Sequence, residues 1–188
     1  MGTTERPARM TVILGANGTG KTTVLKKIVS NLKQKTLIVT PDDAEWQEYD
    51  TVLLDNPQDF LYTGVRKHIF DPDKKYGTLT KLPYFKKGII VFDDCRGYLQ
   101  ANTSQEIHKL LIRRRQQEVD VFVVGHGFTE VPPVFFTFAT NLILFRTTDN
   151  ILRRKNYIKN FDEVLSLQEK VNRLSKKDEH VFEIIDIK

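Results

Sequence analysis

Short runs of apolar residues recur along the chain, and several are separated by stretches with helical spacing. The runs typical of buried strands are Thr11–Leu14, Thr36–Thr40, Gly88–Asp94, Asp120–Val124 and Asn141–Phe145. Helical periodicity is found at about Gly20–Lys33, Ser104–Gln117 and Ile151–Leu174. Strands that alternate with helices form parallel sheets covered on both faces. The pattern therefore predicts an α/β fold in three layers, with a mostly parallel central sheet.

The remaining segments are less regular. Thr51–Leu54 predicts a short strand at a sheet edge, Val134–Ala139 a short helix, and His180–Ile187 a final strand. Residues 55–87 combine a weak helical pattern around Gln58–Lys67 with a turn-rich stretch and mixed basic and aromatic residues. We interpret residues 55–87 as an insertion or surface loop region.

Length and composition indicate one globular domain spanning residues 1–188. The chain is 40% hydrophobic and 28% charged, which is ordinary for a soluble protein. Its single cysteine excludes a disulfide framework. No signal peptide is expected, and the apolar stretch Val131–Ala139 is too short to cross a bilayer. We expect a soluble, cytoplasmic protein without membrane insertion.

The stretch GANGTGKT after the first strand matches the P-loop pattern G-x-x-x-x-G-K-[ST]. Its glycines allow successive backbone N–H groups to point at one phosphate, and a helix start adds a positive dipole. Lys21 would reach the β- and γ-phosphates, and the Thr22 hydroxyl would bind Mg²⁺. The predicted nucleotide-binding residues are Gly15, Ala16, Asn17, Gly18, Thr19, Gly20, Lys21, Thr22 and Thr23. The alternative is a glycine-rich turn without a ligand, although chance matches occur in only about one chain per hundred.

Polar residues end two of the predicted buried strands. Asp93 and Asp94 follow one strand, and His126 follows the next between two glycines. Open α/β sheets bind ligands at the carboxyl ends of their strands. Asp93 is therefore a candidate Mg²⁺ ligand, Asp94 a candidate base for the attacking water, and His126 a candidate sensor of the γ-phosphate. Alternatively, the acids end a strand in solvent and the histidine caps a turn.

The net charge is +5 and the isoelectric point is about 9.2. Basic residues cluster at Lys86-Lys87, Arg113–Arg115, Arg153–Lys155 and Lys176-Lys177. Each cluster alone is more often a solvated face than a binding site. Together they are compatible with a polyanionic partner such as DNA.

The order of these motifs resembles the additional-strand catalytic class of P-loop ATPases. Within that class the chain resembles the FtsK/HerA superfamily, particularly viral genome-packaging ATPases and the motor domain of Zot-like phage proteins. The stretches that carry the resemblance are GANGTGKT, VFDD, DVFVV with a basic residue before it and a polar residue after it, NLILFR and HVFEIIDI. The match differs at Asp94, where the family commonly has Glu, and at His126, where it often has Gln.

The resemblance implies an ATP-hydrolysing, DNA-translocating motor that acts as a homo-oligomeric ring, with ATP and Mg²⁺ as cofactors and DNA as a partner. Viral or phage genome packaging is the implied process. It also implies an arginine that acts in trans on the neighbouring subunit's nucleotide. Arg115 matches that position best, with Arg114 and Arg146 as the next choices. The alternative interpretation of the cluster Arg113–Arg115 is a solvated helix end without a functional role.

Two other functions remain open from the residues. A small nucleotide or metabolite kinase also has this size and a P-loop, and residues 55–87 could then act as its lid. A GTP-binding switch module is the second alternative, but the sequence has no clear N-K-x-D guanine signal.

Overall fold

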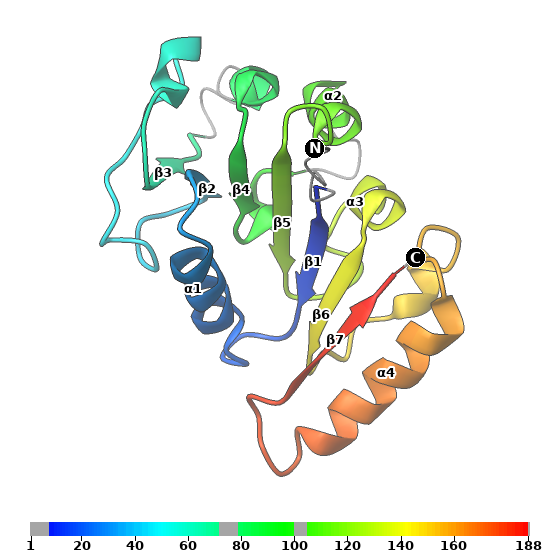
Figure 1. Cartoon of the computed structure of the whole chain (residues 1–188). Helices are drawn as coiled ribbons and strands as arrows, with labels where there is room; N and C mark the ends of the chain where they lie inside the picture. The colour runs from blue at the N-terminus through cyan, green and yellow to red at the C-terminus, as the bar shows by residue number, and fades with distance from the viewer. Residues whose placement is uncertain (1–7, 72–78, 100–104, 188) are drawn as a thin grey trace, which may run out of the picture.

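The computed structural model describes residues 8–71, 79–99 and 105–187, and its centre is a seven-stranded sheet (Figure 1). The strand order is β3-β2-β4-β5-β1-β6-β7. The strands are β1 (Met10–Leu14), β2 (Thr36–Thr40), β3 (Val65–Ile69), β4 (Gly88–Phe92), β5 (Val119–Gly125), β6 (Asn141–Phe145) and β7 (Phe182–Asp186). All pairings are parallel except that of β6 with β7. The predicted mostly parallel α/β sheet is confirmed.

The position of β5 defines the class of the fold. β5 lies between β1, which leads into the P-loop sequence, and β4, which leads into the two acids. This insertion is the arrangement expected of the additional-strand class. Because β1, β4 and β5 are parallel, their carboxyl ends lie at one edge of the sheet. The topology therefore brings the ends of these three strands together, as the sequence predicted.

Helices cover both faces of the sheet and give three layers (Figure 1). One face is covered by α1, and the other by α2, α3 and α4. Alternate residues of β1 serve the two faces, with Ile13 in the core under α1 and Val12 and Leu14 in the core on the other side. The helices are α1 (Lys21–Leu32), α2 (Gln105–Arg113), α3 (Pro133–Phe138) and α4 (Phe161–Leu174). Short 3-10 turns are η1 (Pro57–Phe60), η3 (Leu79–Tyr84), η4 (Cys95–Gly97) and η5 (Ile151–Arg154).

The side of the sheet formed by the outermost strand, β3, differs from the prediction. The predicted strand Thr51–Leu54 is wrong, because only Thr51 forms an isolated bridge, to Lys67. The predicted helix around Gln58–Lys67 is also wrong, since that region contains η1 and the start of β3. Gly64, at φ +76°, interrupts the helical pattern. The VRKHI sequence of β3 is polar, so its hydrophobic pattern did not indicate a strand.

The three longer helical predictions, at about Gly20–Lys33, Ser104–Gln117 and Ile151–Leu174, were correct in position but too long. Ser104 lies outside the described residues, and α2 ends at Arg113 rather than Gln117. The predicted helical stretch Ile151–Leu174 is η5 followed by α4, separated at Asn160, which has φ +53°. Among the described residues, no helix is both long enough and apolar enough to cross a bilayer.

Candidate functional site

The loop between β1 and α1 forms a rigid cradle held by both neighbouring strands. Gly15 N–H donates to the Gly125 carbonyl at 3.3 Å, and Ala16 N–H donates to the Arg146 carbonyl at 2.8 Å. Gly18 and Gly20 have φ of +77° and +96°, which favour glycine. The Thr19 hydroxyl donates to the Ala16 carbonyl at 2.8 Å and closes the loop internally.

The Lys21 ammonium lies at the mouth of this cradle. It donates to the Gly15 carbonyl at 2.6 Å and the Ala16 carbonyl at 3.0 Å. Burial lowers the pKa of Lys21, while the charges of Asp93, Asp94 and other acids nearby act to raise it. The first helical turn of α1 thus places a cation where an anionic ligand would meet the loop.

Asp93 follows β4 and is 6% exposed. Its Oδ2 accepts a hydrogen bond from the Trp46 indole N–H at 2.6 Å, and its Oδ1 accepts one from the Asp94 N–H at 3.2 Å. Burial is the main cause that raises the pKa of Asp93, and the two hydrogen bonds oppose the increase. The carboxylate is therefore held in one orientation by donors on both oxygens.

Asp94 and His126 connect this carboxylate to Lys21. Asp94 has φ +42°, and its Oδ1 lies 3.3 Å from His126 Nε2. The other ring nitrogen, Nδ1, lies 3.4 Å from Lys21 Nζ. A neutral imidazole with its proton on Nε2 satisfies both contacts, accepting from Lys21 and donating to Asp94. The His126 backbone N–H donates to Glu130 Oε2 at 3.1 Å, which fixes the turn after β5.

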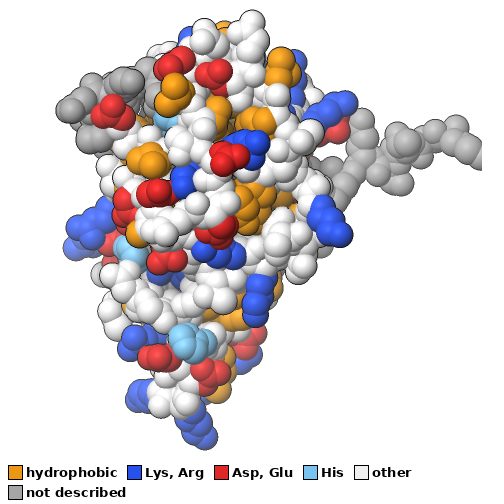
Figure 2. Space-filling model, turned by 90° about the vertical axis from the view of Figure 1, so that its left-hand side faces the viewer, with side chains coloured by type: hydrophobic (Ala, Val, Ile, Leu, Met, Phe, Trp, Pro, Cys, Tyr) orange, Lys and Arg blue, Asp and Glu red, His pale blue; other side chains and the backbone are white. Residues whose placement is uncertain are grey.

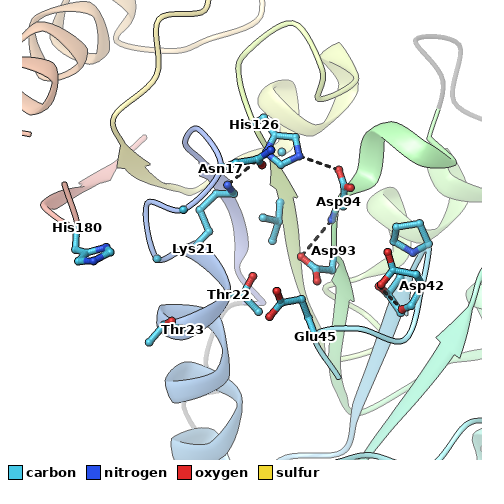
Figure 3. A pocket seen from close by; sticks show the side chains of 16 residues that line it. Asn17, Lys21, Thr22, Thr23, Asp42, Glu45, Asp93, Asp94, His126 and His180 are labelled. Carbon is cyan, nitrogen blue, oxygen red and sulfur yellow. Dashed lines mark hydrogen bonds and ion pairs between the residues drawn. The ribbon is translucent and has the colours of Figure 1, made fainter. Parts of the chain in front are cut away.

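These side chains line one cleft of about 460 Å³ at the carboxyl ends of the strands (Figure 3). The predicted residues Lys21, Thr22, Asp93, Asp94 and His126 meet there. Asn17, Gly18, Gly20 and Thr23 also line it, whereas Gly15, Ala16 and Thr19 build the loop behind it.

Sequence reasoning missed other residues of the cleft. Asp42 and Glu45, from the segment after β2, line it, and so does His180 from the segment before β7. Trp46 contacts Asp93 from beneath. The acids after β2 had one usable signal: they follow a buried parallel strand, as Asp93 and Asp94 do.

The three arginines considered from the sequence lie in different surroundings. Arg115 is exposed and borders a separate cavity of about 680 Å³ at the amino ends of the strands. Arg114 is buried, and its guanidinium donates to the Leu111 carbonyl at 2.7 Å and lies 5.4 Å from the Phe138 ring centroid. Arg146 is exposed and follows β6 beside the P-loop. Arg115 is thus at the opposite sheet edge from the cleft of its own chain.

The cleft offers oxygen donors for a hard cation. Thr22 contributes a hydroxyl and Asp93 a carboxylate. Within the described part of the chain, no group of three or more His, Cys, Asp and Glu side chains could hold a metal by itself. Mg²⁺ is commonly bound by one or two carboxylates together with substrate phosphates and water, so the residues present fit a nucleotide-bound Mg²⁺.

No protein-family model matches the sequence, and no curated protein matches it significantly. Its fold does match solved structures. The genome packaging NTPase B204 from Sulfolobus turreted icosahedral virus 2, in complex with AMPPCP, has a TM-score of 0.74 at 14% identity over 97% of this chain and 94% of that one. B204, the DNA-packaging ATPase from Sulfolobus turreted icosahedral virus, has a TM-score of 0.71 at 16% identity, with coverage of 96% and 93%.

A second kind of protein is also similar in structure. The N-terminal domain of zonular occludens toxin from Neisseria meningitidis has a TM-score of 0.51 at 12% identity, with coverage of 97% of this chain and 96% of that one. At these identities the likeness concerns the fold. The resemblance to viral packaging ATPases and Zot-like proteins is confirmed at that level: this chain has the P-loop NTPase fold that they share.

Proposed function

We propose that this protein is an ATP-hydrolysing P-loop enzyme that serves as the motor of viral or phage genome packaging. The observation that carries the proposal is the convergence of Lys21, Asp94 and His126 on one P-loop cleft. The packaging NTPase B204 supports it, because that protein has this fold and was solved with AMPPCP and with ATP-gammaS.

The side chains of the cleft suit hydrolysis of a nucleoside triphosphate. The loop N–H groups and Lys21 would bind the phosphates, and Thr22 and Asp93 would hold Mg²⁺, which would neutralise phosphate charge. Hydrolysis forms a bond between a water oxygen and the γ-phosphorus and breaks the bond from that phosphorus to the β–γ bridging oxygen. Asp94 accepts the water proton. His126, hydrogen-bonded to both Lys21 and Asp94, aligns the carboxylate and the cation.

The motor function requires partners as well as chemistry. We propose that the chain forms a homo-oligomeric ring, translocates DNA and places Arg115 on the nucleotide of the neighbouring subunit. The position of Arg115 supports this arrangement, because it is exposed at the sheet edge opposite its own cleft. A head-to-tail contact joins two different surfaces of neighbouring copies, and such contacts form a ring when the rotation between copies closes.

A kinase is the alternative. It would need a lid or an acceptor site over the cleft, and residues 55–87 were the candidate. Within their described part, none of these residues lines the cleft, whereas η3 (Leu79–Tyr84) packs on α2 instead. We therefore favour the hydrolase.

The proposal predicts that Lys21→Ala abolishes ATP hydrolysis and weakens ATP binding, because the phosphates lose the cation at the mouth of the loop. The matched control is Lys27→Ala, which removes an exposed lysine from the same helix. Phosphate release and binding of a fluorescent ATP analogue measure the two effects. Undiminished turnover by purified Lys21→Ala protein would show that the cleft is not the active site.

The two acids are expected to respond differently to neutralisation. Asp94→Asn should retain binding of ATP with Mg²⁺ but lose turnover, since an amide cannot accept the proton of water. Asp93→Asn should weaken Mg²⁺-dependent binding. Binding and single-turnover measurements on both variants test the assignment, and the reverse pattern would exchange the two roles.

A further inference from the structure

The segment between β2 and the β3 edge, residues 41–50, is here called the acidic strap. It has the sequence PDDAEWQEYD, and its residues Pro41, Asp42 and Glu45 line the cleft. Trp46, at its middle, is fully buried in the core under α1. Its indole N–H donates to Asp93 Oδ2 at 2.6 Å. The strap is therefore joined directly to the carboxylate that the proposed function assigns to Mg²⁺.

Contacts on both sides hold the acidic strap in place. The buried Lys67 of β3 forms an ion pair with Asp43 and donates to the Trp46 carbonyl at 3.1 Å. On the other side, Lys26 of α1 pairs with Glu48 at 3.0 Å, and its ammonium lies 5.2 Å from the centroid of the Trp46 ring. These contacts fix Trp46 at both its backbone and its ring. The Trp46 indole that orients Asp93 is therefore held in place by contacts with both β3 and α1.

Glu45 precedes Trp46 and lines the cleft. Figure 3 shows its carboxylate on the same side of Asp93 as the Thr22 hydroxyl. Two carboxylates that face one space repel each other unless a cation lies between them.

We propose that the acidic strap completes the Mg²⁺ site: Glu45 supplies a further carboxylate to the hydrated ion, and Trp46 is a positioning residue that holds Asp93. This inference rests on the proposed nucleotide site and deepens it. Mg²⁺ retains several of its waters in proteins, so a carboxylate can serve it through a coordinated water. A donor fixed on the distal oxygen of a ligating carboxylate sets its orientation, and loss of such a partner commonly lowers metal affinity about 10- to 100-fold.

The first test measures metal binding without turnover. Mn²⁺ is titrated into the protein with a non-hydrolysable ATP analogue, and free Mn²⁺ is followed by electron paramagnetic resonance. Glu45→Gln should bind Mn²⁺ about ten-fold more weakly than the wild type. The matched control is Asp50→Asn, at the end of the same strap, whose exposed carboxylate pairs with Arg66 and does not line the cleft, and it should bind as the wild type does. Equal affinity in Glu45→Gln and the wild type would overturn the role of Glu45.

The second test concerns Trp46. Trp46→Phe keeps an aromatic ring in the core but removes the N–H, and it should weaken Mn²⁺ binding about ten-fold with metal-free analogue binding unchanged. Because Trp46 is the sole tryptophan of the chain, its fluorescence in the wild type should also change when Mg²⁺ is added to the analogue complex. This second measurement decides the matter if Trp46→Phe does not fold. Unchanged Mn²⁺ affinity in a folded Trp46→Phe protein, or fluorescence insensitive to Mg²⁺, would overturn the positioning role.

Failure of the nucleotide site itself gives a different result. If the wild type does not bind the analogue with or without metal, the proposed function is wrong, and this inference is wrong with it. If the wild type binds both analogue and Mn²⁺ and the strap variants do so equally well, only the inference is wrong.

Discussion

Asp93 is a buried carboxylate whose ionised form is disfavoured by the fold. Burial raises its pKa above the ordinary value of 3.8 in spite of the hydrogen bonds from Trp46 and from the Asp94 N–H. The folded protein therefore holds this proton more tightly than the unfolded chain does. Where the folded state binds more protons, stability falls as pH rises. A charged cleft without its counter-ion thus costs folding free energy, and a bound cation would offset that cost.

This residue gives a signed prediction for stability. Asp93→Asn removes the titration, so the free energy of unfolding of the variant relative to the wild type should increase as pH rises above 3.8. The increase should end once pH exceeds the raised pKa, and its slope between the unfolded and folded pKa values is at most about 1.4 kcal/mol per pH unit. Urea denaturation over a pH series without nucleotide or metal measures it. Asp55→Asn, at an exposed loop position, is the control, and a flat difference for Asp93→Asn would contradict the burial argument.

At the scale of elements, the P-loop depends on its fit against β6. An added Cβ on Gly15 would lie 2.5 Å from Phe145 Cβ, which is closer than real Cβ contacts allow. Gly18 is a different case, because nothing lies within 4 Å of an added Cβ and only its φ of +77° resists substitution. Gly15 is therefore needed because the loop packs closely against β6, whereas Gly18 is needed because the turn requires a positive φ.

The two glycines predict different losses on substitution by alanine. Gly15→Ala should lower the free energy of unfolding by about 1–3 kcal/mol, since overpacking forces the loop away from β6. Gly18→Ala should lower it by about 1–2 kcal/mol, because alanine is strained in a left-handed conformation. Chemical denaturation gives both values, and nucleotide affinity should fall more in Gly15→Ala because the whole cradle shifts. A Gly15→Ala protein as stable as the wild type would show that the loop is not held against Phe145.

On the scale of the whole molecule, the sheet separates the cleft from Arg115. The cleft is at the carboxyl ends of the strands, and Arg115 is at their amino ends. Arg114 is anchored by the Leu111 and Phe138 carbonyls and stacks on the Phe138 ring, so it serves the fold of its own chain. Of these two arginines, only Arg115 has an exposed side chain, as the proposed action in trans requires.

A mixing experiment tests the action of Arg115 in trans. Arg115→Ala should bind ATP normally and assemble, yet hydrolyse poorly, because an arginine supplied by a neighbour can be worth about 10³–10⁵ in rate. Mixing it with Lys21→Ala should restore part of the activity, since some interfaces then pair an intact P-loop with an intact arginine. Arg114→Ala is the structural comparison and should lose stability instead. A mixture that stays inactive although mixed rings form would rule out Arg115 and make Arg146 the next residue to test.

DNA binding should be governed by distributed charge. The face along the β3 edge in Figure 2 mixes basic and acidic side chains, so the net charge of +5 is not gathered there. We expect DNA to stimulate the ATPase at low salt and its binding to weaken steeply as salt is raised, because neutralised phosphates release counterions. Equal ATPase rates with and without single- or double-stranded DNA at low salt would contradict the proposed motor function.

The sequence by itself determined the cradle and the edge of the sheet at which the chemistry lies. The spacing of Gly15, Gly20 and Lys21 is a local property, and strands joined through helices run parallel. The ends of β1, β4 and β5 therefore share one edge, so Lys21, Asp93 and His126 were expected to meet and do. The roles of these residues in hydrolysis stay predictions.

Only the tertiary structure decided which residues surround that constellation. The polar sequence of β3 resembles a helix end or a loop, and pairing with β2 makes it a strand. The indole N–H of Trp46 meets Asp93 across a long separation in sequence, which no local pattern encodes. Arg114 and Arg115 are neighbours in sequence, yet one is buried and the other exposed. In each case the deciding contacts are long-range, and those contacts exist only once the sheet and its helices have packed.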